Sequence, residues 1–506
     1  MGFIDRVHGE IRRAGVLIRL SQKATSPFTH RLTVKVMNVV GIIGAGASGV
    51  CAARHILASE HWRPVVWESS SHVGGTWRLS HHVGTNSLPV HSSMYENLRT
   101  DLPKMMMAFP DFPFPEDSKS FMHHTTVLKY LEDYTQHYGI HRCIKFGHHV
   151  EKVSPIMKTE GPPAWAVTVR DLTSGLTSST TCDALLVCTG HFTVPYTPHI
   201  EGIENYKGLQ VHSHDYRKPS PYAGSTVVVL GAGASGLDIS LELSSVADKV
   251  LLSHNLPVSI PSELPPNIYQ VPGAVKATQE GFVFSDGSRA QADAIVFCTG
   301  YKYSFPFLTE ECGIQVDDNC VKPLYKHLIN SIYPSMAFIG IPSRVIVFQI
   351  INYQVQYFLA TLTGSVKLPT PDEMTAINDK IHEEWKKQDL KTKHFHMLPT
   401  DQWQYMEDLA TEAGLNQPPP FLKKMWNIVM TRLFLSFPIF RSYEYSLKSD
   451  GSIVEAKDGK VISTSWDLGR LVVQQLARFV WRDFSKIMCL TGSILVNKMN
   501  NILHIS

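Results

Sequence analysis

Two segments of the chain share one pattern of apolar and polar positions. The first, VVGIIGAGASGVCAARHILASE, begins at Val39, and the second, TVVVLGAGASGLDISLELSS, begins at Thr226. Each opens with a continuous β-branched run, typical of a strand buried on both faces, and then passes through a glycine turn into apolar residues at helical spacing. The pattern predicts two strand, turn and helix units of the kind that binds nucleotides.

The first glycine turn has the spacing that phosphate binding needs. Gly44 permits the tight turn, Gly46 lets the backbone approach a pyrophosphate, and Gly49 lets the helix pack closely on the strand. The phosphate would lie at the helix N-terminus, where unpaired N–H groups favour an anion. The next strand ends in Glu68, whose carboxylate can accept both ribose hydroxyls and disfavours a 2′-phosphate. We expect FAD or NAD here; the alternative is that these glycines serve only a turn.

The second turn repeats this spacing without the acid. Its glycines are Gly231, Gly233 and Gly236, and we count Ser235 with the residues that would bind the coenzyme. The following strand, KVLLS, ends at Ser253 and His254, so nothing there repels a 2′-phosphate, although the arginine that usually contacts the phosphate is absent too. This favours NADP over NAD. His254 is the nearest substitute for that arginine, and a solvated turn histidine is the alternative.

Two further buried strands, DALLVCTG and DAIVFCTGY, each end in Thr-Gly, which lets the chain leave a sheet sharply. At the second corner, Thr299 and Gly300 are candidate cofactor-binding residues. The pattern predicts an α/β protein with two Rossmann-like dinucleotide-binding domains, the smaller NADP(H) domain inserted into the larger FAD domain, and the cofactors meeting at their interface. The expected division is an N-terminal extension (1–36), the FAD domain (37–193 and 302–450), the NADP(H) domain (194–301) and a C-terminal tail (451–506).

Composition narrows the function classes. Of the 506 residues, 43% are hydrophobic and 18% are charged, which is enough apolar material for more than one core. The net charge of +2 provides no overall field that would recruit nucleic acid. The eight cysteines are too sparse for a disulfide scaffold, and no CxxC pair suggests zinc or dithiol chemistry. We therefore expect free thiols, no metal site and no nucleic-acid partner.

The two ends of the chain bear on location. The segment from Ile11 to Ser59 contains basic but no acidic residues, which is the composition of an organellar presequence. Residues 1–36 are therefore either a mitochondrial targeting segment or a disordered or loosely packed extension. No apolar run reaches the roughly 18 to 20 residues of a spanning helix. The C-terminal tail near Arg470, Trp481 and Lys486 is basic and amphipathic. It could lie on a membrane surface, and the alternative is that it packs on its own domain. We expect a cytoplasmic protein or one associated with the endoplasmic reticulum membrane, and we leave a homodimer open.

The tract YKGLQVHSHDYR resembles the fingerprint FxGxxxHxxxY of the flavin-containing monooxygenases. It is matched by Tyr206 in the Phe position and by Gly208, His212 and Tyr216. Related Baeyer-Villiger enzymes carry Trp at the last position, so Tyr216 indicates the branch that oxygenates nitrogen and sulfur, and we expect an invertebrate-like member of it. GGTW (74–77), SMYENLRT (93–100), FPDFPFP (109–115), CTGYKYSFPFL (298–308) and PSMAFIGIP (334–342) are also similar, and together they cover about residues 39–440 in the family's order.

The resemblance implies FAD and NADP(H) as cofactors and assigns further residues to them. Gly75, Thr76 and Trp77 would approach the flavin, with Trp77 as an aromatic wall. His212 would lie in the linker that orders around bound NADP, with an ordinary loop histidine as the alternative, and we count Tyr216 with the cofactor-binding residues. Gln354 would lie near the isoalloxazine ring, unless it is a core glutamine with its hydrogen bonds satisfied. FPDFPFP is expected to be a rigid loop with a structural role rather than a substrate contact.

The resemblance also implies a reaction. NADPH delivers hydride to the flavin N5, dioxygen adds to give a C4a-hydroperoxide, and the retained NADP+ shields it. A soft nucleophile, the amine nitrogen or thioether sulfur of a small molecule, then takes the distal oxygen. Because the flavin carries the chemistry, no nucleophile and base triad is required. The expected partners are therefore dioxygen and a small amine or thioether.

Asp101, in RTDLPK, is a candidate catalytic position that departs from the family pattern, which places Asn there. An Asn amide can donate toward the flavin adduct, whereas an ionised Asp can only accept and would repel a developing peroxide anion. Burial could keep Asp101 protonated and restore a donor. If it is ionised, we expect a partly uncoupled NADPH oxidase that releases hydrogen peroxide.

Two other functions compete with the monooxygenase interpretation. A pyridine nucleotide disulfide reductase shares paired nucleotide domains but needs a cysteine pair beside the flavin, and neither Cys51 nor the pair Cys312 and Cys320 has the spacing. A non-catalytic FAD- and NADP(H)-binding protein would explain both Asp101 and the missing phosphate-binding arginine.

Overall fold

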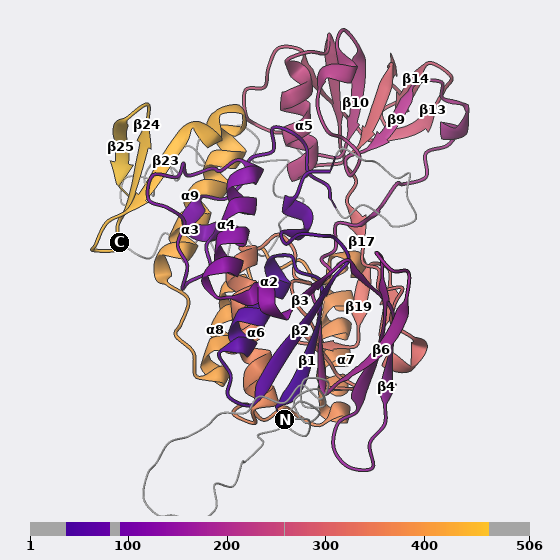
Figure 1. Ribbon diagram of the computed structural model, residues 1–506. Coiled ribbons are helices and arrows are strands. Elements are labelled where there is room, and N and C mark those ends of the chain that lie inside the picture. Colours follow the sequence, from indigo (N-terminus) through magenta and orange to yellow (C-terminus); the bar gives the residue numbers. More distant parts are fainter. Residues whose placement is uncertain (1–36, 81–91, 258, 465–506) are drawn as a thin grey trace, which may run out of the picture.

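The computed structural model describes residues 37–80, 92–257 and 259–464, and all structural statements below concern these ranges. Figure 1 shows two α/β units, one above the other, joined by short crossing segments. The predicted N-terminal extension and most of the predicted C-terminal tail, including its amphipathic segment, lie outside the described residues.

The sheet of the larger unit is centred on β1 (Asn38–Ile43). It pairs in parallel with β2 (Trp62–Glu68) on one side and with β7 (Ala184–Val187) on the other. The remaining strands give the order β20-β21-β22-β7-β1-β2-β3, with β3 (Ile144–Phe146), β20 (Leu324–Tyr325), β21 (Ile329–Asn330) and β22 (Met336–Phe338). Strands that precede and follow the smaller unit in sequence therefore contribute to one sheet.

Both faces of this sheet are covered, as its apolar strands predict. On one face Val40 and Ile42 pack with α2 (Ala47–Leu57), α4 (His124–His137), α6 (Val347–Leu362) and α8 (Gln402–Ala413). On the other face Ile43 packs with the antiparallel strands β4 (His148–Ile156), β5 (Ala164–Asp171) and β6 (Thr177–Cys182).

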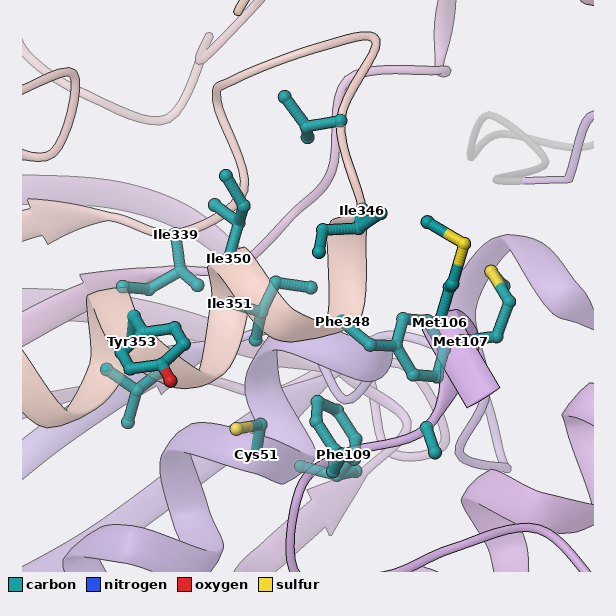
Figure 2. Close-up of a cluster of buried hydrophobic side chains, with 14 of the residues drawn as sticks. Cys51, Met106, Met107, Phe109, Ile339, Ile346, Phe348, Ile350, Ile351 and Tyr353 are labelled. Carbon is teal, nitrogen blue, oxygen red and sulfur yellow. The ribbon is translucent and has the colours of Figure 1, made fainter. Parts of the chain in front are cut away.

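Figure 2 shows the helix-side core of this unit, between α2, α6 and the short α3 (Lys104–Met107). Phe109 stacks on Phe348 with ring centroids 4.9 Å apart, close to Cys51. Phe114, from the same FPDFPFP tract, is also buried and stacks on Tyr130. This proline-rich loop therefore supplies core side chains, which is the structural role expected of it.

The smaller unit repeats the plan around β10 (Thr226–Leu230). Its parallel sheet has the order β12-β11-β10-β16-β9, with β9 (Leu209–His212), β11 (Lys249–Ser253), β12 (Ile268–Val271) and β16 (Ala294–Phe297). Helix α5 (Ala234–Ser244) packs on one face, and the strands β13 (Ala274–Ala277), β14 (Gly281–Phe284) and β15 (Arg289–Gln291) pack on the other. The fold is the predicted class, an α/β protein with two dinucleotide-binding units.

The two segments that cross between the units lie side by side. β8 (Val194–Pro195) pairs in antiparallel fashion with β17 (Tyr301–Lys302), and Pro195 lies opposite Tyr301. The chain thus enters and leaves the smaller unit at one point. Residues 194 and 301 remain our predicted boundaries for the inserted domain.

The rest of the described chain packs mainly around the larger unit. It comprises β18 (Gln315–Asp317), β19 (Cys320–Lys322), α7 (Pro371–Lys387), α9 (Pro420–Leu435), the 3-10 helix η7 (Phe437–Ser442), β23 (Tyr443–Leu447), β24 (Ile453–Lys457) and β25 (Lys460–Thr464). Across the described ranges, no helix combines the length and the apolar character that crossing a membrane requires.

Candidate active site

The first glycine turn is closed by backbone contacts that leave no room for side chains. Gly44 has φ +100°, a conformation that favours glycine, and its N–H donates to the Trp67 carbonyl at 2.8 Å. A Cβ on Gly49 would lie 1.9 Å from the Gly44 carbonyl oxygen. Helix α2 can therefore follow β1 this closely only with glycine at both positions.

Glu68, at the end of β2, fastens this turn. The residue is buried, its Oε2 accepts from the Ala45 N–H at 2.8 Å, and its Oε1 accepts from the Ser70 N–H at 2.8 Å. The carboxylate thus lies at the strand edge where a ribose would be held. Binding of ribose by Glu68 stays a prediction.

The GGTW tract forms a second glycine turn against the first. The Gly74 N–H donates to the Ala45 carbonyl at 3.1 Å, and a Cβ on Gly46 would lie 3.6 Å from the Gly75 Cα, so the two backbones meet with no side chain between them. The 3-10 helix η1 (Gly75–Trp77) follows, with Thr76 Oγ1 3.3 Å from Ser93 Oγ and Trp77 packed on the core. Adjacent bare peptide groups fit the close approach of a dinucleotide pyrophosphate.

The glycine turn of the smaller unit has the same closure but more open surroundings. Gly231 has φ +111°, and a Cβ on Gly236 would lie 1.8 Å from the Gly231 carbonyl oxygen. A Cβ on Gly233, in contrast, would meet nothing within 4 Å. Ser235, in the first turn of α5, is partly exposed. Backbone N–H groups here remain accessible to an incoming phosphate.

Ser253 and His254 differ in how far the fold already uses them. Ser253 is fully buried, its hydroxyl donates to the Pro272 carbonyl at 2.8 Å, and it accepts from the Ala274 N–H at 3.0 Å. His254 is partly exposed, with Nε2 3.1 Å from Gln270 Oε1. The geometry therefore favours a structural role for Ser253 and leaves His254 as the more accessible of the two groups.

Four of the buried polar atoms without a hydrogen-bond partner lie where the units meet, and the others, such as the Tyr134 hydroxyl, are spread over the rest of the described chain. The four are Thr189 Oγ1 and His191 Nε2, beside the Thr-Gly corner after β7, and His212 Nε2 and His214 Nε2, in the linker that follows β9. The Tyr301 ring joins the two groups: its centroid lies 5.3 Å from those of His212 and Phe192. Burial lowers the pKa of His191 and of His212 to about 4, so both imidazoles are neutral near pH 7.

The second Thr-Gly corner is held by the crossing segment. Thr299 Oγ1 donates to the Tyr196 carbonyl, and the Tyr196 N–H donates to the Gly300 carbonyl at 2.9 Å. Gly300 has φ +86°, which turns the chain out of the sheet. These bonds fix the corner, and direct contact of Thr299 or Gly300 with a cofactor stays a prediction.

These residues fit the two cofactors that the sequence predicts. Unpaired buried polar atoms are costly unless a ligand or water satisfies them, and four of them lie between the two units. The bare glycine turns of the larger unit fit FAD, and the open turn of the smaller unit, with no acid at the end of β11, fits NADP(H).

Tyr216 lies inside the core of the smaller unit. Its hydroxyl donates to Glu242 Oε2 at 2.8 Å, and its ring meets the Tyr95 ring edge-on with centroids 5.5 Å apart. Only 1% of the residue is exposed. This placement favours packing of the linker over the direct cofactor contact that we predicted.

Gln354, on α6, is fully buried with partners at both ends of its amide. Its Oε1 accepts from the Gly340 N–H at 2.9 Å, and its Nε2 donates to the Tyr405 hydroxyl at 2.8 Å. The geometry therefore favours the alternative of a satisfied core glutamine. Contact of Gln354 with a flavin stays a prediction.

Asp101 is paired with a cation that the sequence did not point to. Arg441 Nη2 donates to Asp101 Oδ1 at 2.6 Å, and Arg441 Nη1 donates to Asp238 of α5. Burial raises the pKa of the Asp101 carboxyl, and the Arg441 guanidinium opposes that rise. Because Arg441 Nη2 donates to it, Asp101 Oδ1 serves as a hydrogen-bond acceptor in this pair.

Two groups of functional interest were missed from the sequence. His191 directly follows the first Thr-Gly corner, and that position could have indicated a residue at the cofactor edge. Arg441 lies far along the chain from Asp101, and no local pattern marks it.

Within the described part of the chain, Cys51 and Cys188 do not provide a redox pair for a disulfide reductase. Cys51 lies in the core with Cys188, and burial raises the pKa of both thiols well above its ordinary value. Such thiols stay protonated at neutral pH and are poor nucleophiles. Every cysteine described is a free thiol.

Fold and site together define a flavin- and nicotinamide-dependent oxidoreductase. A family model described as flavin-binding monooxygenase-like matches residues 37–259 and 254–497. The chain belongs to this family, whose members use FAD and NADPH in monooxygenation. The predicted FAD and NADP(H) cofactors and the predicted enzyme class are thereby confirmed.

Named relatives refine this placement. The chain is 36% identical over 466 residues to flavin-containing monooxygenase FMO GS-OX-like 6 of Arabidopsis thaliana, covering 88% of this chain and 96% of the relative. The structure of S-allyl-L-cysteine S-oxygenase from Allium sativum superposes with a TM-score of 0.76 at 32% identity, covering 81% of this chain and 96% of that one. Cyclohexanone monooxygenase, at 16% identity and a TM-score of 0.56, shares the fold. The first two relatives are from plants, and the expected invertebrate affinity finds no support in them.

Proposed function

We propose that this chain is an S-oxygenase of small thioethers. It would convert a thioether, dioxygen, NADPH and a proton into a sulfoxide, NADP+ and water. The proposal is supported by the 32% identity to S-allyl-L-cysteine S-oxygenase over most of both chains. A thioether sulfur attacks through its own lone pair and needs no deprotonation, which agrees with a site that offers neutral imidazoles in place of a strong base.

Each unit of the chain would contribute binding and positioning. Gly44, Gly46 and Gly49 would cradle the FAD pyrophosphate, and Glu68 would hold the ribose. Gly231, Gly233 and Gly236, with His254, would hold NADP(H). Bound FAD, once reduced by NADPH, supplies the oxygen-activating chemistry.

One observation carries the proposal on the structural side. Thr189, His191, His212 and His214 present unpartnered buried polar atoms between the two units. A site that leaves hydrogen-bonding capacity at this junction suits a coenzyme that stays beside the flavin.

The direct test uses purified protein with bound flavin. We expect S-allyl-L-cysteine to yield a sulfoxide, detected by mass spectrometry, only when both NADPH and dioxygen are present. A tertiary amine of similar size, assayed in parallel, tests nitrogen oxygenation. An N-oxide as the main product, or NADPH-dependent flavin reduction without any oxygenated product, would contradict the proposal.

A second candidate, a partly uncoupled NADPH oxidase, is favoured by the Asp101 and Arg441 pair. An ionised Asp101 offers no donor where the family pattern has an amide. We expect sulfoxide formed per NADPH consumed to be below one in the wild-type protein and to rise in Asp101→Asn, with hydrogen peroxide accounting for the difference. Equal and complete coupling in both proteins would remove this candidate.

A further inference from the structure

Arg441 lies where the larger unit, the smaller unit and the C-terminal segment meet. From η7, its Nη2 donates to Asp101 Oδ1 of the larger unit at 2.6 Å, and its Nη1 donates to Asp238 Oδ1 on α5 of the smaller unit. Its Nε donates to the Thr100 carbonyl at 3.1 Å. The Arg441 side chain is 15% exposed, so one largely buried cation is shared by carboxylates from two units.

The carboxylate on the smaller unit has a second partner from the larger unit. The Tyr95 hydroxyl donates to Asp238 Oδ2, and the Tyr95 ring is buried against Tyr216. Both oxygens of Asp238 are therefore held by groups that lie outside its own unit. Although burial acts against the charge, Asp238 and Asp101 together raise the pKa of Arg441, which keeps the guanidinium protonated.

The segment that carries Arg441 contacts both units. We call residues 434–445 the C-terminal strap. At one end, Ser262 of the smaller unit accepts from the Phe437 N–H at 3.0 Å and donates to the Phe434 carbonyl at 2.7 Å. At the other end, the Tyr445 N–H donates to Ser120 Oγ of the larger unit at 2.7 Å, and Glu444 accepts from the Ser120 N–H at 2.8 Å. The strap thus spans the junction, with Arg441 between its two anchors.

We propose that Arg441 is a positioning residue for hydride transfer, because it fixes the smaller unit, with its coenzyme, against the larger unit, with its flavin. Hydride transfer needs the two reacting atoms near contact distance, and a displacement of about 1 Å can cost on the order of a hundredfold in rate. Without the cation, Asp101 and Asp238 would repel each other across the junction. The inference rests on the FAD and NADPH chemistry of the family and is independent of the thioether substrate.

The chemistry of arginine explains why this residue suits the position. A planar guanidinium presents several donors in a fixed fork, so it can bond two carboxylates and a carbonyl at once. A lysine ammonium is a point charge and would hold one carboxylate better than the other. Arg441→Lys should therefore recover part of the function that Arg441→Gln loses.

The test compares Arg441→Gln with Arg432→Gln. Arg432 makes a bidentate pair with Glu455, at 2.9 and 2.8 Å, in which the Arg432 side chain is 11% exposed and the Glu455 side chain is fully buried. Both residues belong to the C-terminal segment, and although Arg432 also lies over the Tyr443 ring of the strap, this ion pair does not join the two units. Flavin reduction by saturating NADPH is followed by stopped flow without any thioether. Flavin content, reduction by dithionite and amide hydrogen exchange of the α5 peptide are measured on the same proteins.

We expect Arg441→Gln to lower the limiting rate constant of flavin reduction by NADPH at least about tenfold. FAD content and dithionite reduction should be unchanged, and amide exchange in α5 should be faster. Arg441→Lys should lie between this variant and the wild type, and Arg432→Gln should leave all four readouts near wild type. A loss of equal size in Arg432→Gln, or a change in the half-saturating NADPH concentration alone, would overturn the proposal.

If Arg441→Gln does not fold, Asp238→Asn decides the question, since it keeps the pair between Arg441 and Asp101. The expected result is a slower limiting reduction with faster exchange in α5; wild-type reduction would overturn the proposal. Because no thioether is present, failure to oxygenate sulfur would leave this result unaffected.

Discussion

The two dinucleotide units share the same closure of the glycine turn but differ in what surrounds it. In each unit the last glycine of the turn packs against the carbonyl group of the first. An added Cβ would lie 1.9 Å from that carbonyl oxygen at Gly49 and 1.8 Å from it at Gly236. Gly46, however, faces Gly75 of the second glycine turn, and the neighbouring Ala45 N–H donates to Glu68. A Cβ on Gly233, in contrast, would meet nothing within 4 Å. The glycine turn of the larger unit is therefore enclosed by other backbone, whereas that of the smaller unit is open.

This difference matches two kinds of ligand. A cofactor that remains bound through many turnovers gains from a preformed, enclosed cradle, because less order has to be created on binding. A coenzyme that arrives reduced and leaves oxidised needs an open entrance. We interpret the first unit as the binding site of a cofactor that stays bound, and the second as the binding site of a coenzyme that is exchanged in each turnover.

The largest expected effect comes from placing a methyl group in each closed turn. Gly49→Ala and Gly236→Ala both drive a Cβ into backbone, so we expect each to destabilise its own unit by on the order of 3 kcal/mol or more. Gly49→Ala should lose bound flavin, and Gly236→Ala should stay yellow but lose flavin bleaching by NADPH. Flavin absorbance per polypeptide, before and after addition of NADPH, measures flavin content and bleaching, and thermal unfolding measures the loss of stability.

Gly287→Ala is the control for a Gly→Ala substitution that causes no steric clash. Gly287 lies on an exposed hairpin turn, and an added Cβ would meet nothing within 4 Å. It has φ +83°, so a modest backbone cost is expected there. If Gly236→Ala also emptied the flavin site, the two units would not act separately, and the comparison would fail.

The pH dependence of stability tests a feature that the units share. Each contains a buried histidine, His55 on α2 and His212 at the end of β9, and burial lowers the pKa of both from 6.5 to about 4. The unfolded chain then binds more protons than the folded one below pH 6.5, so stability is complete above that pH and is lost as the pH falls toward 4.

Each histidine should contribute a slope of about 1.4 kcal/mol per pH unit in this window. His55→Asn and His212→Asn should each flatten the dependence of the unfolding free energy on pH, whatever they do to stability at pH 7. Denaturant unfolding at several pH values measures the slope. A slope that neither substitution changes would show that other groups control acid unfolding.

The smallest expected effect concerns the coenzyme alone. His254→Arg adds the cation that the smaller unit lacks, and we expect the ratio of kcat/KM for NADPH to that for NADH to rise about tenfold, or about 1.4 kcal/mol, with stability changed by no more than about 0.5 kcal/mol. Ser253→Ala is the matched comparison, because the Ser253 hydroxyl is already used by Pro272 and Ala274. A loss of NADPH preference in Ser253→Ala would show that the serine does contact the phosphate.

The sequence was most informative where local geometry decides the residue. The glycine turns and the Thr-Gly corners were predictable because a strand followed at once by a helix or a sharp exit tolerates few residue types, and Gly44 and Gly49 have backbone where a side chain would be. The fold class followed from the apolar runs around these turns. The family resemblance rested on the same local tracts.

The contacts of several candidate site residues depend on partners distant in sequence. Gln354 and Tyr216 are assigned to cofactors by position, which stays a prediction, and tertiary packing brings Gly340 and Tyr405 to the first and Glu242 to the second. Asp101 was recognised as a departure from the family pattern. Its cation, Arg441, could not be foreseen, since nothing local links residues separated by most of the chain.

The antiparallel pairing of β8 with β17, where Pro195 lies opposite Tyr301, has a consequence for protein engineering. Because the two ends of the intervening polypeptide are hydrogen-bonded neighbours, that polypeptide can be excised or exchanged without stretching the host backbone. A chimera grafted at this seam would carry its own nicotinamide specificity as a module. The graft should retain an acidic residue in place of Asp238, which faces the guanidinium of Arg441, and a hydroxyl in place of Ser262, which anchors the C-terminal strap.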